Sequence, residues 1–275
     1  MSHIFISVII CCYNSEKYII ETLESVINQT YSKYEIIIID DGSRDNTKNL
    51  INKFILDYPK IIIKIISQQN SGLPIARNVA IANSSYDYIA ILDHDDLWES
   101  NKLLEQVKQI NDNKNCALFF SDFKYLNYKS KTTSRFQTAI EKDNYDPSIL
   151  NLNNKKGFIN LSLLGCFIGS STVIFNKKIL NTIGKFNTNF NFLTDYIFFL
   201  DVSKKFNIYC SNLKLSSWRY HDDNATIKLN KTYVKEMNIL FLYLLKEKIF
   251  SRYQKLKIFI KFLKFNFKNY LFYGN

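Results

Sequence analysis

Five continuous apolar runs of strand length, separated by segments with helical periodicity, constrain the fold of this sequence more than any other feature. They are Ile6–Cys12, Glu35–Asp40, Lys60–Ile66, Tyr88–Leu92 and Cys116–Ser121. A run that is apolar at nearly every position suits a strand that is buried on both faces. Alternation of such strands with amphipathic helices predicts an α/β fold, with a mostly parallel sheet and helices on both of its faces.

The helices between these strands have recognisable start signals. Asn14 or Ser15 can cap the first helix, Pro74 suits the first turn of the third, and Ser100 can cap the fourth. The remaining chain is less regular. We expect an irregular segment over 124–156, mostly loop with some local structure, then core structure over 163–175 and helices over 177–186 and 195–205.

Composition excludes several classes of protein. The chain has 275 residues, of which 47% are hydrophobic and 15% aromatic, so a wholly disordered chain is excluded. Seven Gly and three Pro are too few for a turn-rich all-β design. The five Cys include no CxxC pair, no secretory leader precedes them, and none has zinc-site spacing to the three His. This pattern predicts a reducing, cytoplasmic location and no zinc site.

Positive charge is concentrated at the C-terminal end of the chain. Residues 228–275 hold eleven Lys or Arg and two Glu, so they carry +9 of the net charge of +11. The remaining 227 residues are therefore nearly neutral. This asymmetry predicts an anionic partner for the tail rather than for the whole protein.

The same tail has the pattern of an amphipathic helix. Its apolar residues at helical spacing are Leu256, Phe259, Ile260, Leu263 and Phe267, and its basic stripe is Lys257, Lys261, Lys264 and Lys268. Such a helix can lie in a membrane interface, pack on the body with its lysines outward, or form a dimer contact. We predict peripheral membrane contact through residues 228–275.

Carboxylates gather where two of the predicted strands end. The stretch "YIAILDHDDLW" places Asp93, Asp95 and Asp96 after the fourth strand. Burial of such a cluster without a partner costs several kcal/mol, whereas a divalent cation removes the conflict. Oxygen ligands suit Mn²⁺ or Mg²⁺, which commonly bridge substrate phosphates. For an isolated D-x-D pattern, a solvated acidic loop would be the favoured interpretation.

A second acidic strand end weakens that alternative. Asp40 and Asp41 end the second strand in "IIIIDDGS", and Tyr13 follows the first. Ligands of open α/β sheets bind at the carboxyl ends of the strands. These residues therefore indicate a nucleotide pocket at this edge of the sheet.

Four motifs together resemble a known family. "SVIICCYN", "EIIIIDDGS", "NSGLPIARN" and "YIAILDHDD" are similar to the ordered motifs of family 2 inverting glycosyltransferases of the GT-A fold, of the bacterial surface-polysaccharide type. The similarity is strong over 7–98 and looser to about 221. It implies a Rossmann-like sheet in a catalytic domain over 1–227, with a nucleotide-binding half at about 1–122 and an acceptor half at about 123–227. A helical C-terminal extension, the basic tail, would follow over 228–275.

The resemblance also implies roles for the nucleotide-binding residues. Tyr13 and Asp41 would hold the nucleobase, usually uracil, while Asp40 supports their loop. Arg77 would approach the nucleotide, although an exposed helix arginine is an equal alternative. Asp93 would contact the ribose or order its loop.

The metal and phosphate contacts follow in the same way. Asp95 and Asp96 would share a Mn²⁺ or Mg²⁺ ion, and the sequence does not rank them. His221 would complete the metal shell or touch the diphosphate, and Arg219 would neutralise phosphate charge. His94 is expected to point away from the site.

The segment from 183 to 200 resembles the acceptor side of the family's site, where Glu-Asp typically stands at the start of a helix. Thr194 replaces the usual Glu, so Asp195 is the candidate catalytic base; the alternative is an acid favoured by the helix dipole. Ser170 and Ser171 would border the sugar or acceptor pocket.

The resemblance therefore implies a metal-dependent inverting glycosyltransferase. It would move a sugar from a nucleotide-sugar to a saccharide or lipid-linked saccharide at the inner face of the cytoplasmic membrane. A UDP-sugar is the expected donor. A sugar-nucleotide nucleotidyltransferase would show a Gly-rich basic loop after the first strand, which this chain lacks. Near-neutral charge in the body and acidic strand ends oppose a nucleic-acid-binding protein, so no nucleic acid partner is expected. The retained aspartates argue against a non-catalytic relative.

Overall fold

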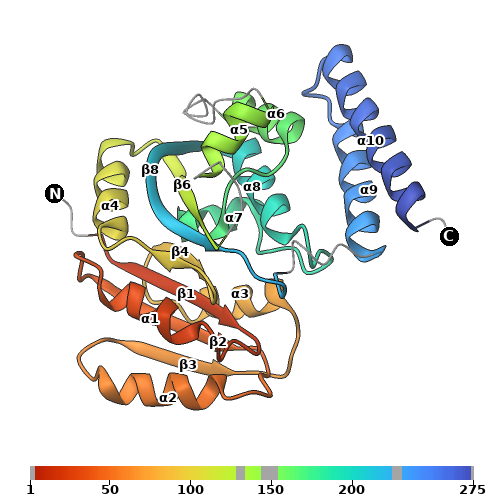
Figure 1. Cartoon of the computed structure of the whole chain (residues 1–275). Coiled ribbons are helices and arrows are strands. Elements are labelled where there is room, and N and C mark those ends of the chain that lie inside the picture. Colours follow the sequence, from red (N-terminus) through yellow and green to blue (C-terminus); the bar gives the residue numbers. More distant parts are fainter. Residues whose placement is uncertain (1–3, 128–133, 144–153, 225–230, 274–275) are drawn as a thin grey trace.

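The computed structural model describes residues 4–127, 134–143, 154–224 and 231–273. Within this part of the chain, eight strands form one sheet in the order β3-β2-β1-β4-β7-β6-β8-β5 (Figure 1). The strands are β1 Ile6–Cys12, β2 Tyr34–Asp40, β3 Ile63–Ser67, β4 Tyr88–Asp93, β5 Leu97–Trp98, β6 Cys116–Leu126, β7 Ile174–Asn176 and β8 Asn207–Arg219.

The predicted α/β class and mostly parallel sheet are confirmed. Strands β1 to β4 are parallel to one another, as is the pair β6 and β8. Strand β7 runs antiparallel between β4 and β6, and β5 is antiparallel to β8. The fifth predicted strand, β6, therefore does not extend the parallel series directly, because a short strand from much later in the chain separates it from β4.

Helices cover both faces of the sheet. Their bounds are α1 Ile19–Ile27, α2 Thr47–Asp57, α3 Leu73–Ala82, α4 Lys102–Asp112, α5 Arg135–Asp143, α6 Asn154–Leu164, α7 Leu180–Ile183, α8 Thr194–Lys205, α9 Lys231–Lys246 and α10 Arg252–Tyr273. One apolar core joins α1, α2 and α4 to the sheet, and the other joins it to α3, α6 and α8. Side chains that alternate along β1, β2 and β4 supply the two cores, which explains why these strands are apolar at nearly every position.

Two segments differ from expectation. The stretch 124–156 is less irregular than predicted: β6 continues to Leu126, α5 lies within it and α6 begins at Asn154, while 128–133 and 144–153 lie outside the described residues. The predicted helix 177–186 is a 3₁₀ turn, η3 (Lys177–Ile179), followed by the short α7. Gly184 ends α7 with a φ of +82°, a left-handed conformation that glycine adopts readily.

Helices α9 and α10 form a hairpin at the side of the molecule, next to α6 (Figure 1). Leu240, Phe241 and Leu244 of α9 and Ile258 of α10 are buried in the same core as α6 and α8. The hairpin is thus packed on the body, as one of the alternatives for the tail supposed. In the described part of the chain, no helix combines the length and hydropathy that crossing a bilayer requires.

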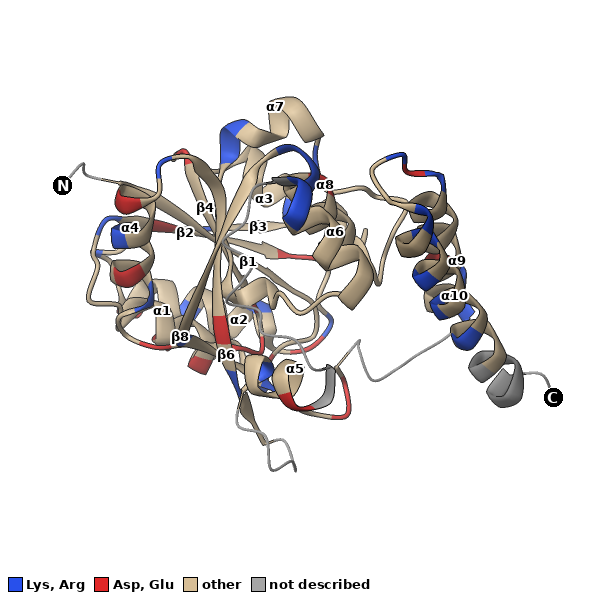
Figure 2. Ribbon diagram, turned by 90° about the horizontal axis from the view of Figure 1, so that it is seen from above, with Lys and Arg blue, Asp and Glu red and all other residues tan. Residues whose placement is uncertain are grey.

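The outer face of α10 is apolar and basic. The predicted apolar stripe is solvent-exposed, from 42% for Ile260 to 67% for Phe267. Figure 2 shows Lys and Arg recurring along both helices of the hairpin. Between Arg252 and Tyr273 the sequence contains no Asp or Glu. The helix therefore packs through one face and presents an apolar face to solvent.

Candidate active site

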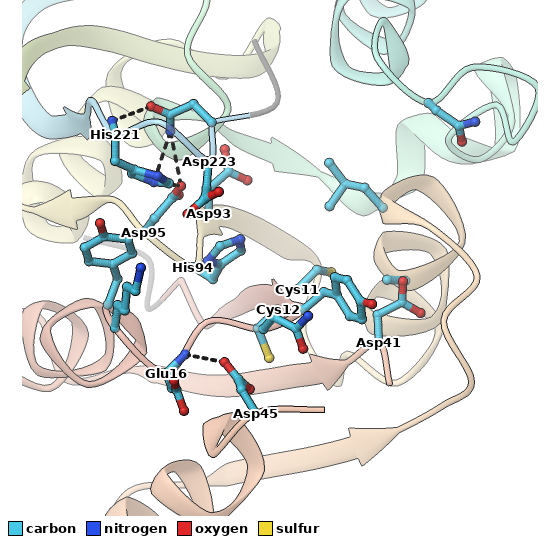
Figure 3. Close-up of a pocket in the computed structure, with 18 of the residues that line it drawn as sticks. Cys11, Cys12, Glu16, Asp41, Asp45, Asp93, His94, Asp95, His221 and Asp223 are labelled. Atoms are coloured by element: carbon cyan, nitrogen blue, oxygen red, sulfur yellow. Dashed lines mark hydrogen bonds and ion pairs between the residues drawn. The ribbon is translucent and has the colours of Figure 1, made fainter. Parts of the chain in front are cut away.

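The carboxyl ends of β1, β2 and β4 meet at one edge of the sheet. Their register places Cys12 beside Asp40, and Cys11 beside Asp93. A pocket of about 1010 Å³ opens at this edge, and residues of 191–195 and 221–224 form its other walls (Figure 3). The acidic strand ends thus lie together, as the parallel topology predicts.

Tyr13 and Asp41, the predicted nucleobase contacts, both line this pocket. Tyr13 is 41% exposed, so its ring is open to a ligand. The buried carboxylate of Asp41 accepts hydrogen bonds from the Gln68 side chain and from the backbone N–H groups of Ser71 and Gly72, at 2.7–2.9 Å. These bonds fix the orientation of Asp41.

The neighbouring Asp40 supports the turn that follows β2. Its Oδ1 accepts a hydrogen bond from the Ser43 N–H at 3.0 Å, and the side chain is buried. Gly42 has a φ of +80°, and a Cβ there would lie 2.8 Å from the Asn70 nitrogen. The turn therefore needs glycine for its conformation and for space.

Arg77 is not the exposed helix arginine of the alternative interpretation, because only 1% of its side chain is exposed. Its guanidinium forms ion pairs with Asp93, at 2.8 Å, and with Asp195. Arg77 does not itself line the pocket, whereas both carboxylates do. No local sequence pattern indicated that the predicted base, Asp195, and Asp93 at the end of β4 share one cation.

Asp195 lies in the first turn of α8, with 24% of its side chain exposed. The N–H groups at a helix N-terminus favour a negative charge there. Together with Arg77 they stabilise a carboxylate that still reaches the pocket, which is the arrangement a general base requires.

Asp95 and His221 form a pair in the pocket, with Asn224 beside them. The Oδ2 of Asp95 lies 2.9 Å from His221 Nε2 and 3.4 Å from Asn224 Nδ2. Figure 3 shows Asp95 and His221 side by side, apart from Asp41. Among the described residues, His221 Nδ1 is buried without a hydrogen-bond partner.

The Asp95–His221 pair fits a divalent cation in part. Adjacent ligands of an octahedral ion with bonds of about 2.1 Å are about 3 Å apart, close to the separation of these two atoms. Within the part of the chain that the structure describes, no group of three or more Asp, Glu, His or Cys is arranged for a metal. An ion held here would thus need further ligands from phosphate oxygens and water, as Mg²⁺ and Mn²⁺ commonly take.

Asp96, the other predicted metal ligand, is not brought into the pocket. It is 3% exposed, and its two oxygens accept hydrogen bonds from the Ser171 hydroxyl at 2.6 Å and the Arg219 N–H at 3.0 Å. Burial raises the pKa of Asp96 well above its usual value, and the nearby charges of Asp95 and Asp93 add to the effect. Through these two hydrogen bonds, Asp96 connects the loop after β4 to Ser171 and to the end of β8 at Arg219.

Ser170, Ser171 and Arg219 also lie outside the pocket lining. Besides its bond to Asp96, the Ser171 hydroxyl accepts a hydrogen bond from the Asp93 N–H at 3.1 Å. Arg219 donates from Nε to the Asp95 carbonyl at 2.8 Å, and its guanidinium lies 4.8 Å from the centre of the Tyr18 ring. Ser171 and Arg219 thus hold the 93–96 segment in place without lining the pocket themselves.

Other pocket residues were not predicted. His94 lines the pocket, so the expectation that it points away is wrong. Asp223 and Asn224 stand in the segment that contains His221, a signal that could have identified them. Asn191 and Tyr233 carried no local signal, because they reach the pocket only through the packing of α8 and α9.

Comparison with known proteins identifies the family. Residues 7–184 match the model of glycosyl transferase family 2. The chain belongs to this family. It is therefore a glycosyltransferase, and the comparisons give no support to the nucleotidyltransferase or nucleic-acid-binding alternatives.

Three curated relatives align with this glycosyltransferase over most of its length. Two are named UDP-Glc:alpha-D-GlcNAc-diphosphoundecaprenol beta-1,3-glucosyltransferases of Escherichia coli: WfaP is 33% identical over 86% of this chain and 85% of its own, and WfgD is 30% identical over 84% and 82%. The third, named the putative teichuronic acid biosynthesis glycosyltransferase TuaG of Bacillus subtilis, is 30% identical over 82% of each chain.

Solved structures confirm the GT-A fold of this glycosyltransferase. TarS 1-349 of S. aureus in complex with UDP-GlcNAc superposes with a TM-score of 0.70 at 20% identity, over 96% of this chain and 73% of that one. The mannosyltransferase PcManGT of Pyrobaculum calidifontis, in complex with GDP-Man and Mn²⁺, has a TM-score of 0.63 at 15% identity, over 95% and 70%.

Proposed function

We propose that this glycosyltransferase transfers a sugar, with inversion, from a UDP-sugar to a hydroxyl of a lipid-linked saccharide in bacterial surface-glycan synthesis. The observation that carries the proposal is the presence of Tyr13, Asp41, Asp95 and Asp195 in one pocket at the carboxyl edge of the sheet. Two relatives are named for UDP-Glc donors and diphosphoundecaprenol-linked acceptors, which supports the choice of donor and acceptor classes.

The nucleotide would lie along the strand ends. Tyr13 would stack on the base, Asp41 would accept a base N–H, and Asp93 would lie near the ribose. Asp41 is already oriented by its loop, and Asp93 by Arg77, so both sites are organised before the donor binds.

Asp95 and His221 would hold a Mn²⁺ or Mg²⁺ ion against the donor. When bound, such an ion supplies positive charge that stabilises the departing diphosphate. Asn224 donates to Asp95 and would keep its carboxylate facing the ion. Asp96, engaged by Ser171 and Arg219, would support this arrangement without direct coordination.

Asp195 would act as the base. As the acceptor oxygen attacks the anomeric carbon from the face opposite the diphosphate, its proton passes to the Asp195 carboxylate. The bond between that carbon and the diphosphate breaks at the same time, and its electron pair leaves with UDP. Arg77 would orient the base and link it to Asp93 on the donor side.

The outer face of α10 would contact the membrane that carries the acceptor. Its apolar side chains can enter the interface between head groups and acyl chains, while lysines on the same helix meet anionic lipids. This contact would place the enzyme at the inner face of the cytoplasmic membrane.

A donor panel tests the proposal. Purified protein with Mn²⁺ or Mg²⁺ is screened against nucleotide sugars by thermal shift and slow donor hydrolysis, then assayed with a sugar-diphospholipid acceptor. We expect a UDP-sugar to stabilise the protein in the presence of metal. Asp195→Asn should keep that stabilisation and lose transfer, whereas Asp201→Asn, further along the same helix and outside the pocket, should retain transfer. Full activity of Asp195→Asn would exclude the base role, and stabilisation only by other nucleotides would exclude UDP.

A further inference from the structure

Glu236 of α9 is the one acid that α9 or α10 contributes to the described structure. Although only 3% exposed, it forms no ion pair with a lysine or arginine of the described chain. Its carboxylate instead accepts three backbone hydrogen bonds: Asn191 N–H to Oε1 at 2.8 Å, and Phe192 N–H and Leu193 N–H to Oε2, each at 3.0 Å. Burial of a carboxylate is tolerated when several N–H groups solvate its charge in this way.

These three amides lead directly into helix α8. That helix begins at Thr194, has Leu193 at its N-cap with no capping side chain, and carries Asp195 in its first turn. The first N–H groups of a helix lack partners within it and are commonly satisfied by a nearby Ser, Thr, Asp or Asn. Thr194 does not fill this role, since its hydroxyl is buried without a partner. Instead, the Glu236 carboxylate on α9 accepts hydrogen bonds from the backbone that leads into α8.

The loop held by Glu236 is a wall of the pocket. Asn191 and Phe192 line the pocket together with Asp195. The Phe192 ring packs edge-on against Tyr233, 6.3 Å away between centroids, and Tyr233 is one turn before Glu236 on α9 and also lines the pocket. Helix α9 therefore lines the pocket directly through Tyr233, and Glu236 contacts the backbone of the pocket wall.

We infer that Glu236 is a positioning residue that sets the place of the Asp195 carboxylate through the 191–193 backbone. This inference rests on the proposed role of Asp195 as the base. Glu236 does not itself line the pocket, so its effect on the substrate is indirect. Loss of its three hydrogen bonds frees the start of α8 to move relative to Arg77 and the acceptor. The proposed donor contacts on β1, β2 and β4 stay in place, because other residues hold them.

The hairpin offers a matched control. Glu247, just after α9, pairs with Lys204 near the end of α8 at 2.6 Å. Glu247→Gln therefore removes an ion pair between the same hairpin and the same helix, but at the end far from Asp195. Glu236→Ala and the milder Glu236→Gln, which keeps one acceptor oxygen, are compared with it.

The test measures steady-state transfer and amide hydrogen exchange of the full chain. We expect Glu236→Ala to lower kcat by about 10- to 100-fold, as small displacements of a catalytic group can, while the KM for the UDP-sugar stays within about threefold. Exchange at 191–193 should accelerate in Glu236→Ala, and less in Glu236→Gln. Glu247→Gln should keep both kcat and the exchange of this loop near the wild-type values.

Two outcomes would overturn the inference: equal loss of kcat in Glu236→Ala and Glu247→Gln, or unchanged exchange at 191–193. If Glu236→Ala does not fold, Glu236→Gln is judged by the same criteria. If the wild-type protein transfers no sugar from any donor, the proposed function fails, and the exchange measurement still decides whether Glu236 holds the loop.

Discussion

Arg77 and Asp195 form an ion pair that joins helix α3 to the start of α8. The same guanidinium pairs with Asp93 at the end of β4 and lies 5.5 Å from the centre of the Phe186 ring. One buried cation thus fixes two pocket carboxylates that are far apart in sequence. Arginine suits this position because its planar guanidinium can address two acceptors at once.

Arg77→Met should destabilise the protein by about 3–5 kcal/mol and abolish transfer, because it leaves two carboxylates close together without their cation. Urea unfolding and a transfer assay measure the two effects. Lys178→Met is the control: its ion pair with Asp87 joins side chains that are 71% and 58% exposed, and its loss should cost less than about 1 kcal/mol. Equal destabilisation by the two variants would show that the buried Arg77 ion pairs contribute no more stability than an exposed ion pair.

Asp95→Ala and Asp96→Ala should fail in different ways. Asp95→Ala should unfold close to the wild-type temperature but lose metal-dependent UDP binding, measured by calorimetry. Asp96→Ala leaves the Ser171 hydroxyl and the Arg219 N–H without their buried acceptor, which should cost about 1–3 kcal/mol of stability for each unsatisfied group. Loss of metal-dependent binding in a stable Asp96→Ala protein would instead identify Asp96 as a ligand.

Stability should depend on pH through Asp201 of α8. Burial raises its pKa from 3.8 to about 6, with Lys204 opposing the shift and Glu247 adding to it. The unfolded chain therefore loses this proton first, and the stabilisation present below pH 4 is lost as the pH rises through 6.

Asp201→Asn removes this dependence. The Tm of the variant relative to wild type should thus increase between pH 4 and pH 7, by roughly 2–4 °C after allowance for solvent screening. Asp57→Asn, at an exposed site on α2, is the control and should show a difference that does not grow with pH. A constant Tm difference for Asp201→Asn would contradict the prediction.

Membrane contact should depend on the exposed face of α10. The triple variant Leu256→Ser, Leu263→Ser and Phe267→Ser removes side chains that are 51–67% exposed, so the fold should persist. We expect it to pellet with anionic liposomes at least about tenfold less than wild type. Leu56→Ser, which removes a 79% exposed leucine from α2, should pellet as wild type does. Equal pelleting of the triple variant would exclude this face as the membrane contact.

Much of the nucleotide-binding half could be predicted because its signals are local. Strands β1, β2 and β4 are almost continuous apolar runs, and parallel strands bring their carboxyl ends to one edge whatever surrounds them. The positions of Tyr13, Asp41 and Asp93 at the pocket follow from this topology. Strand β3 was placed only approximately, since Ile62 before it is 53% exposed rather than buried.

Other features depend on contacts between distant segments, which the order of residues does not encode locally. Asp95 and Asp96 are adjacent and chemically identical, yet one faces the pocket and the other is buried against Ser171 and Arg219. From local sequence alone, Arg77 was equally compatible with an exposed helix face. In the structure it is buried and pairs with Asp93 and Asp195. The sequence by itself determined the parallel strands β1 to β4 and the edge at which the acids gather. Only the tertiary structure decided which acids share a cation, and that α9 supports the active-site loop, because each depends on which distant backbone and side-chain groups burial brings within hydrogen-bonding distance.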